Sequence, residues 1–421
     1  MRRICHLSIG ASAAARLGME HKTSLIQPVT AGVLAAVVGF ASAFAVVLEG
    51  LAGAGASPAQ AASGLLALCV AQGLLSIVLS LRWRQPINIV WSTPGAALLV
   101  SATSPHGGFG LAVTAFLLTG ALIVTAGLSR PLARAVAAIP LSLASAMLAG
   151  VLMELCLAPV QAVARLPNLA LPIVIAWALG WSFARRYSVP IAVLVATLIV
   201  VSTTRIPASA AALAWPHPQF ITPTFDLVRA AGLAVPLFIV TMASQNVPGL
   251  AVLRGNGYDI KVGKVFVSTG LGTVVVAFFG GHAINLSAIT AALCAGPEAA
   301  PDPGRRYIAS IAAGVVYIVL GLCAGFAAVL IAASPPLLIQ AVAGLALLGT
   351  LGTALATALA DEQHRLAAVT TFITTASGIS IGGIAGAFWG LLAGGVMLLL
   401  DPAVRNRRRA SLSIQQPGYR G

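Results

Sequence analysis

The chain has 421 residues, of which 59% are hydrophobic and only 8% are charged, and its formal net charge is +14. Soluble domains carry about 25% charged residues, so this composition cannot supply a solvated surface and excludes a water-soluble protein. The sequence therefore predicts an all-α integral membrane protein, and at about 20 apolar residues per span its length allows roughly fourteen transmembrane spans.

The first segment, residues 1–26, is predicted to be a cytoplasmic tail. Four basic residues flank a short apolar run there, namely Arg2, Arg3, Arg16 and Lys22. A cleaved signal peptide is a weaker alternative, because the run is short and no polar mature domain follows it. Met19 is an alternative start to Met1.

Hydropathy and the positions of Gly and Pro then predict fourteen spans in chain order. They cover residues 29–48, 59–81, 87–101, 110–128, 141–158, 168–183, 189–204, 227–246, 265–280, 284–295, 307–330, 336–358, 366–381 and 384–400. A basic cytoplasmic tail, 402–421, is predicted to follow.

Spans three and ten are too short to cross about 30 Å of hydrocarbon as continuous helices. Span three reads INIVWSTPGAALLVS, in which an extended start is followed by a helix start with Pro94 in its first turn. Span ten follows Gly280-Gly281, and Asn285 is predicted to cap its helix. We therefore expect each span to be a short extended segment followed by a half-helix.

The two broken spans occupy the third place in each half of the chain. The predicted repeats are 27–204 and 227–401, and an odd number of spans per repeat makes them inverted. Interrupted spans at corresponding places of two inverted repeats mark the substrate site of many transporters. The sequence thus predicts a transporter with two inverted seven-span repeats.

Basic residues indicate the orientation. With both termini in the cytoplasm, every Lys and Arg faces inward except Arg165, Arg205 and Arg229, in agreement with the positive-inside rule. The positive charge is thus explained by topology and by anionic membrane lipids, and no nucleic-acid partner is needed.

The half-helix starts are the first candidate binding residues. The N-terminus of a helix presents N–H groups and a positive dipole end, which together favour an anion. We expect Ser92, Thr93 and Gly95 to face Asn285 and Ser287 near the membrane midplane. An ordinary proline kink is the alternative for span three.

A polar cluster ends span eight, where Gln245 and Asn246 could hold a carboxylate or a ring through their side-chain N–H groups. The alternative is an interfacial helix end that Asn246 caps and Pro248 stops; for Asn246 this is an equally good interpretation. Proton coupling could use Glu49 or His282. Both are predicted at outer span ends, where a solvated loop position is the stronger interpretation.

No other chemistry is expected. The five cysteines are far apart and lack neighbouring ligands at metal spacing, so we predict no metal, no cofactor and no catalytic residue. An intramembrane enzyme is not expected either, because no nucleophile and base cluster is visible. The stripe Gly382, Gly386, Gly390 and Gly394 indicates close helix packing, within the bundle or across a homodimer.

Several long stretches resemble sequences of the benzoate membrane transport family, whose members are benzoate:proton symporters of bacterial inner membranes. They are QPVTAGVLAAVVGFASAFAVV, WSTPGAALL, IPLSLASAMLAGV, PLFIVTMASQNVPGLAVLRGNGY and GGHAINLSAITAALCAGPEAAPDPGRRY. The resemblance covers about residues 27–400 and implies a distant relation to uracil and sulfate permeases, whose fold has core and gate domains. The ligand-binding carboxylates of uracil permeases fall near Gln245 and Thr290, neither of which is acidic, so the resemblance argues against a nucleobase.

The resemblance implies import of benzoate or a similar aromatic carboxylate together with protons across the bacterial inner membrane, by alternating access. The carboxylate would bind at the two half-helix ends, and Gln245 would contribute more than Asn246. The alternatives are transport of another small organic or inorganic anion, or an anion channel.

Overall fold

The computed structural model describes residues 25–100, 108–129, 140–183, 187–203, 217–287, 289–381 and 384–400. Nearly all of the predicted N-terminal tail, the whole predicted C-terminal tail and Gly382 lie outside these residues. Seven described helical segments are long and apolar enough to cross a membrane, and four further apolar helices have 10–17 residues. The chain is a multi-pass membrane protein.

The first half contains seven helices and one strand in its described part. They are α2 (Ile26–Gly53), α3 (Pro58–Trp83), β1 (Ile89–Trp91), α4 (Thr93–Val100), α5 (Phe109–Leu128), α7 (Leu141–Arg165), α8 (Pro167–Phe183) and α9 (Ser188–Thr203). The broken third span is confirmed, since the strand β1 is followed directly by the eight-residue helix α4.

The second half repeats this order. Its main elements are α11 (Leu227–Thr241), α12 (Val247–Gly255), α13 (Val262–Ala277), β2 (Ile284–Leu286), α14 (Ile289–Ala295), α15 (Tyr307–Gly321), α16 (Ala324–Ala333), α17 (Pro336–Leu359), α18 (Arg365–Ala376) and α19 (Gly386–Leu400). The tenth span is broken as predicted. The eleventh, expected as one helix, is divided into α15 and α16 around Leu322 and Cys323.

The packing pairs recur between the halves. The contact between α5 and α13 corresponds to the contact between α15 and α3. The contact between α2 and α4 corresponds to that between α12 and α14, and the contact between α8 and α9 corresponds to that between α18 and α19. The equivalent helices α7 and α17 pack on each other. Equivalent helices in the two halves thus make equivalent contacts, as expected for the predicted repeat.

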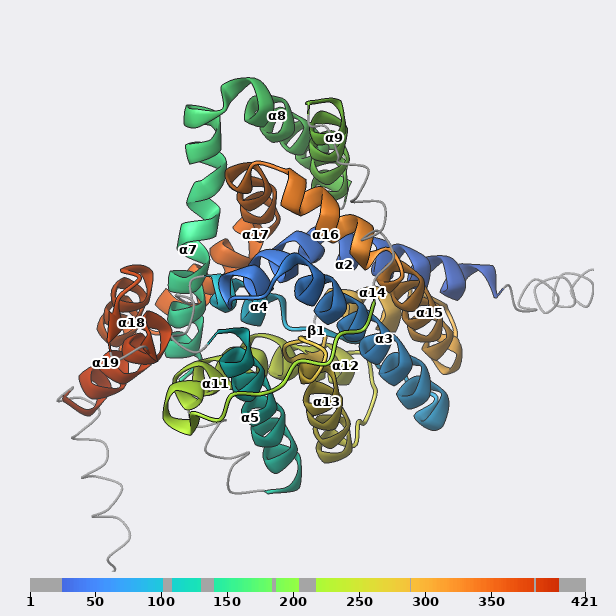
Figure 1. Cartoon of the computed structure of the whole chain (residues 1–421). Helices are drawn as coiled ribbons and strands as arrows, with labels where there is room; N and C mark the ends of the chain where they lie inside the picture. The colour runs from blue at the N-terminus through green and yellow to red at the C-terminus, as the bar shows by residue number, and fades with distance from the viewer. Residues whose placement is uncertain are drawn as a thin grey trace, which may run out of the picture.

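Two groups of helices can be distinguished in Figure 1. Helices α7 to α9 and α17 to α19 lie at the top and left, and the remaining helices surround the strands. A separate apolar cluster joins α7, α8, α9 and α17 through residues such as Ile173, Val200 and Leu338. A larger apolar cluster joins α2 to α5 with α11 to α14 and also includes residues of α7, α16, α17 and α19. We call α7 to α9 together with α17 to α19 the peripheral group, and the remaining helices the central group.

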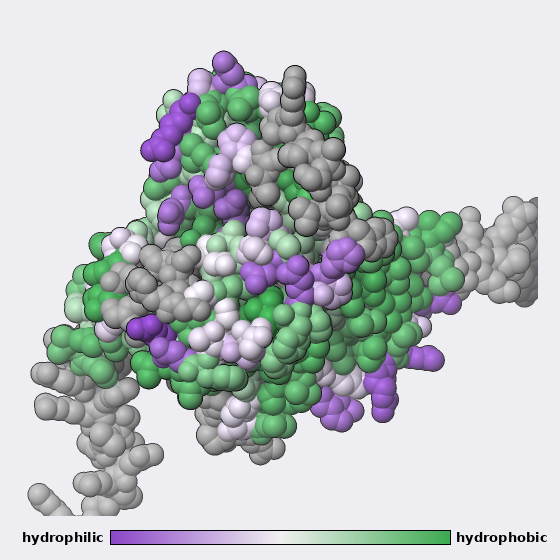
Figure 2. All heavy atoms as spheres, in the orientation of Figure 1, coloured by the Kyte–Doolittle hydropathy of each residue, from purple (hydrophilic) through white to green (hydrophobic). Residues whose placement is uncertain are grey.

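The outer surface is suited to lipid. Large apolar side chains are exposed along α3, with Leu74 50%, Val78 55% and Leu81 54% exposed. Figure 2 shows apolar residues over broad areas of the visible face, with hydrophilic residues gathered in limited places. An apolar surface of this extent would be unstable in water.

Two helices continue through prolines at which the sequence predicts their ends. Helix α7 runs past Pro159 to Arg165. Pro159 leaves the Leu155 carbonyl without its helical partner; a Cβ added at Gly344 of α17 would collide with that carbonyl, so α17 covers it closely. Covering of this kind by a neighbouring helix lets a transmembrane helix tolerate an internal proline.

The second case is span eight, which does not stop at Pro248. A π-helical turn over Met242–Asn246 connects α11 to α12, and its last bond runs from the Val247 N–H to the Met242 carbonyl. The interpretation of Asn246 as an interfacial cap is therefore wrong. Single π-helical turns inside α-helices are frequent at functional sites.

The glycine stripe lies inside the bundle in the described part of the chain. A Cβ at Gly390 would collide with Thr375 Oγ1, and one at Gly394 would collide with Thr371 Oγ1. These glycines therefore allow α19 to approach α18. The stripe favours the packing alternative over the dimer alternative.

Candidate functional site

The two broken spans meet through their strands. β1 and β2 are antiparallel, and Ile89, Val90 and Trp91 pair with Leu286, Asn285 and Ile284, respectively. Two further bonds extend the pair, from Ser92 N to Ala283 O and from Ser287 N to Asn88 O, at 2.9 and 3.0 Å. The half-helices α4 and α14 therefore start from one small sheet at the centre of the bundle (Figure 1).

The edge of β1 that faces α3 is satisfied by side chains of that helix. Gln72 Oε1 accepts a bond from Trp91 N at 2.7 Å, and Ser76 Oγ accepts one from Ile89 N at 2.9 Å. Unpaired backbone groups are costly in a membrane. The polar residues of α3 thus act in place of a further strand.

The outer edge of β2 is satisfied in the same way. Asn246 Oδ1 accepts a bond from Leu286 N at 2.9 Å, and Thr273 Oγ1 accepts one from Ile284 N at 3.1 Å. Asn246 is fully buried. It therefore holds the strand in position, and Gln245 is the residue of this pair that faces the cavity.

Serine side chains cap both half-helices. Ser92 Oγ accepts a bond from Gly95 N at 3.1 Å, and Ser287 Oγ accepts one from Thr290 N at 3.0 Å. The prediction that Asn285 caps the second half-helix is wrong. Asn285 lies within β2 and its Nδ2 donates to Leu286 O, whereas Ser287 is the residue whose side chain bonds an N–H in the first turn of α14.

A cavity of about 110 Å³ lies where the half-helix starts meet α2, α15 and α17. Four of the predicted binding residues line it, namely Thr93, Gln245, Ser287 and Thr290. The other four are buried beside it, namely Ser92, Gly95, Asn246 and Asn285. The sequence thus predicted residues that lie in and around one cavity, but it did not separate the lining residues from those that support them.

The cavity has an aromatic wall that the sequence analysis missed. Trp91 and Tyr317 both line it, and their ring centroids lie 6.2 Å apart at 63°. Phe40 lies behind Trp91 at 5.7 Å. Tyr317 lies in an apolar stretch of α15, and Trp91 lies two residues before the start of α4; these aromatic residues were the available signals.

Hydroxyl groups also line the cavity. Besides the predicted residues, Ser42 of α2 and Thr350 of α17 line the cavity. Thr290 is 4% exposed, and its Oγ1 has no hydrogen-bond partner among the described residues. Because buried polar atoms are nearly always paired, this hydroxyl is a strong candidate for binding a ligand.

No ionisable carboxylate, lysine, arginine or histidine is among the described residues that line this cavity. An anion there would be held by hydroxyl and amide groups and by the positive end of α4. A monovalent anion can be bound in this way without a full counter-charge, because donors aligned at a helix start supply partial positive charge.

Comparison with known proteins assigns the chain to a family. The family described as "Benzoate membrane transport protein" matches residues 22–400. The chain belongs to the benzoate membrane transport family. A protein of that name from Acinetobacter baylyi is 30% identical over 374 residues, which are 88% of this chain and 95% of the relative.

A second relative is the inner membrane protein YdcO of Escherichia coli. It is 40% identical over 384 residues, which are 90% of this chain and 97% of the relative. Each of the two relatives thus matches about nine-tenths of this chain.

Two solved structures share the fold. The transmembrane domain of the cyanobacterial bicarbonate transporter BicA has a TM-score of 0.56 at 18% identity, over 90% of this chain and 97% of that chain. Murine Solute Carrier 26 family member A9, an anion transporter, has a TM-score of 0.57 at 13% identity, over 90% and 69%. These likenesses establish the inverted-repeat transmembrane fold for this member of the benzoate membrane transport family.

The two proton-coupling candidates are not solvated loop residues in this family member. His282 is fully buried, and its Nε2 lies 3.0 Å from Ser92 O. A carbonyl can only accept, so Nε2 carries the proton; Nδ1 has no partner among the described residues. His282 does not line the cavity, but it contacts the residue that caps α4.

Glu49 lies inside α2 and is half-buried. Its side chain forms a hydrogen bond with Gln340 of α17. It therefore joins the central group to the peripheral group. Among the described residues, no group of three or more His, Cys, Asp or Glu side chains could hold a metal ion.

Proposed function

We propose that the chain imports benzoate or a similar aromatic carboxylate together with protons across the bacterial inner membrane, by alternating access. The observation that carries the proposal is the cavity of about 110 Å³ at the crossing of the broken spans, which is lined by two aromatic rings and by several hydroxyl groups. Its volume is of the order of a cavity of about 150 Å³ that holds a single benzene ring.

The lining of the cavity suggests how the ligand binds. The carboxylate would accept hydrogen bonds from the hydroxyls of Thr93, Ser287 and Thr290, close to the start of α4, where the helix dipole favours negative charge. The ring would pack against Trp91 and Tyr317. An aromatic pair at this spacing accepts a third ring in an edge or offset arrangement.

The cavity also supports alternating access. It lies between α2, α4 and α14 of the central group and α17 of the peripheral group, to which Leu347 and Thr350 belong. A relative movement of the groups would open the same site to either side of the membrane, as in other inverted-repeat transporters.

Two residues are proposed for proton coupling, each with a different geometry. Glu49 bonds across the two groups to Gln340, so its protonation would weaken or strengthen a contact that changes during transport. His282 bonds to the carbonyl of Ser92, so its charge would act on the start of α4. Membrane lipids and a second copy of the chain are proposed as further partners.

Uptake of labelled benzoate by proteoliposomes tests this proposal. We expect accumulation when the interior is alkaline, with strong competition by salicylate and weak competition by uracil and sulfate. Neutral benzoic acid crosses lipid unaided, so the assay is run above neutral pH, where the acid is ionised, and protein-free vesicles are subtracted. Uptake that sulfate suppresses better than salicylate would point to another anion, and equilibration without accumulation would point to a channel.

A further inference from the structure

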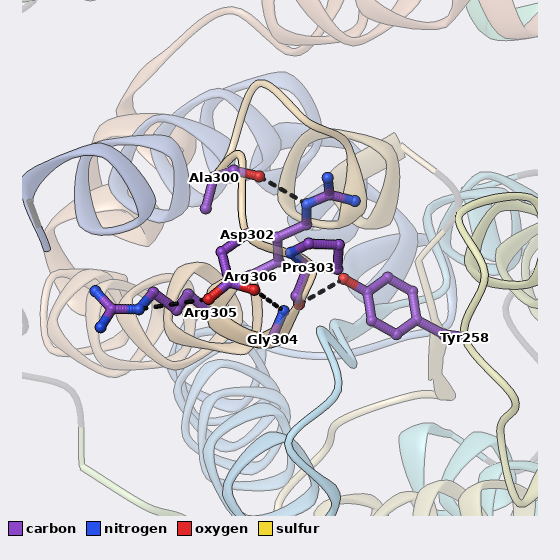
Figure 3. A network of polar contacts seen from close by, with 7 residues as sticks. All are labelled: Tyr258, Ala300, Asp302, Pro303, Gly304, Arg305 and Arg306. Carbon is purple, nitrogen blue, oxygen red and sulfur yellow. Dashed lines mark hydrogen bonds and ion pairs between the residues drawn. The ribbon is translucent and has the colours of Figure 1, made fainter. Parts of the chain in front are cut away.

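The half-helix α14 ends on a buried arginine. Arg306 is only 7% exposed; its Nε donates to Ala300 O and its Nη1 donates to Ala295 O, both at 2.8 Å. Ala295 is the last residue of α14. Figure 3 shows the bond to Ala300 within the turn that follows the half-helix.

This contact provides a hydrogen-bond partner for a carbonyl group at the end of a short helix. α14 has seven residues, and the last four carbonyls of any helix have no partner within it. Helices of this length are unstable by themselves. A guanidinium at the carboxyl end provides charge-assisted hydrogen bonds and a cation where the helix dipole is negative.

A second contact ties the same turn to span eight. Tyr258 follows α12, and its hydroxyl donates to Pro303 O at 2.9 Å (Figure 3). Burial raises the pKa of Tyr258, while nearby Arg306 lowers it. The phenol is therefore a protonated donor throughout the neutral range, and this contact does not switch with physiological pH.

The neighbouring arginine has a different environment. The Arg305 side chain is 37% exposed, and its Nε lies 3.6 Å from Asp302 Oδ2, whose side chain is 58% exposed. Solvated pairs of this kind contribute little to stability. Arg305 therefore offers a matched control, with the same charge on the adjacent residue and a solvated ion pair to Asp302 in place of a bond to α14.

We propose that Arg306 is a positioning residue, which sets the place of Thr290 and Leu293 in the cavity by fixing the far end of α14. The effect on transport rests on the proposed function of that cavity, whereas the effect on α14 does not. Asn88 Nδ2 holds the same half-helix at its start by donating to Thr290 O at 3.1 Å. Loss of Arg306 therefore leaves the bonds of Asn88 and Ser287 at the start of α14 and removes the bond at its end.

The test combines hydrogen exchange with uptake kinetics in purified Arg306→Gln, Arg306→Lys and Arg305→Gln proteins. In Arg306→Gln, amide exchange across residues 289–295 should be roughly tenfold faster, because charge-assisted bonds at the helix end are lost. The KM for benzoate should rise by a similar factor while the maximal rate per folded transporter is retained. Arg306→Lys should be intermediate, and Arg305→Gln should match the wild type.

Several outcomes would overturn the inference. Unchanged exchange in Arg306→Gln would do so, as would a fall in maximal rate with an unchanged KM, which indicates a purely structural role. If Arg306→Gln does not fold, Arg306→Lys decides, and wild-type exchange and KM in that variant would contradict the proposal. Failure of the wild type to transport benzoate would reject the proposed function, while exchange at α14 would still test the role of Arg306.

Discussion

Replacing Thr93 or Ser287 by aspartate is expected to abolish benzoate uptake while leaving membrane insertion intact. Both residues line the cavity, which lacks a lysine or arginine among its described lining residues. Two like charges about 4 Å apart repel by about 4 kcal/mol at an effective dielectric constant of about 20, which corresponds to roughly a thousandfold loss of affinity. The measurement is initial uptake in vesicles that contain equal amounts of folded protein.

The neutral variants Thr93→Val and Ser287→Ala serve as controls for this charge effect. Each should lose less than its aspartate counterpart, because the donors of the other lining residues remain. Ser287→Ala should also lower the free energy of unfolding by about 1 kcal/mol, since the Ser287 side chain caps α14. Normal transport by both folded aspartate variants would mean that the anion binds elsewhere.

Adding one methyl group at Gly39 is expected to reduce uptake by about tenfold or more. A Cβ there would lie 2.6 Å from the Tyr317 hydroxyl and 3.2 Å from Thr290 Cγ2. Both neighbours line the cavity with Gly39, and Tyr317 is only 2% exposed, so its ring cannot swing away. Overpacking of this kind costs about 1–3 kcal/mol. The measurement is the KM for benzoate uptake by proteoliposomes that contain the Gly39→Ala protein.

The double variant Gly39→Ala/Tyr317→Phe makes this test specific. Removing the Tyr317 hydroxyl leaves the ring carbon that carried it 3.8 Å from the new Cβ, an ordinary contact. Uptake should therefore recover in the double variant, and Tyr317→Phe alone should transport. Wild-type KM in Gly39→Ala, or no recovery in the double variant of a folded protein, would show that this wall does not bound the ligand.

The architecture could be predicted because membrane thickness constrains it. Spans three and ten were too short to cross, and Pro94 gave the start of the first half-helix. The continuation past Pro159 and Pro248 could not be predicted, because it depends on a neighbouring helix in one case and on a π-helical turn in the other. The sequence shows that each proline lacks a backbone N–H, but it does not show which neighbouring structure compensates for the lost hydrogen bond.

The site was predicted less completely, for a similar reason. Thr93 and Ser287 were found because helix starts carry recognisable residues. Gly39, Tyr317 and Thr350 come from three other helices, and only their packing brings them to the same cavity. His282 was assigned to a loop edge because a histidine between two spans usually lies in water, whereas the fold buries it against the Ser92 carbonyl.

Benzoate is expected to bind in the cavity between β1, β2 and the aromatic pair. A structure with bound 4-bromobenzoate, first shown to compete with benzoate for uptake, tests it most directly, because the bromine can be located by its anomalous signal. We expect the carboxylate within hydrogen-bond distance of Thr93, Ser287 or Thr290 and the ring against Trp91 and Tyr317. Bromine bound at a different place, with this cavity closed by its own side chains, would contradict the account.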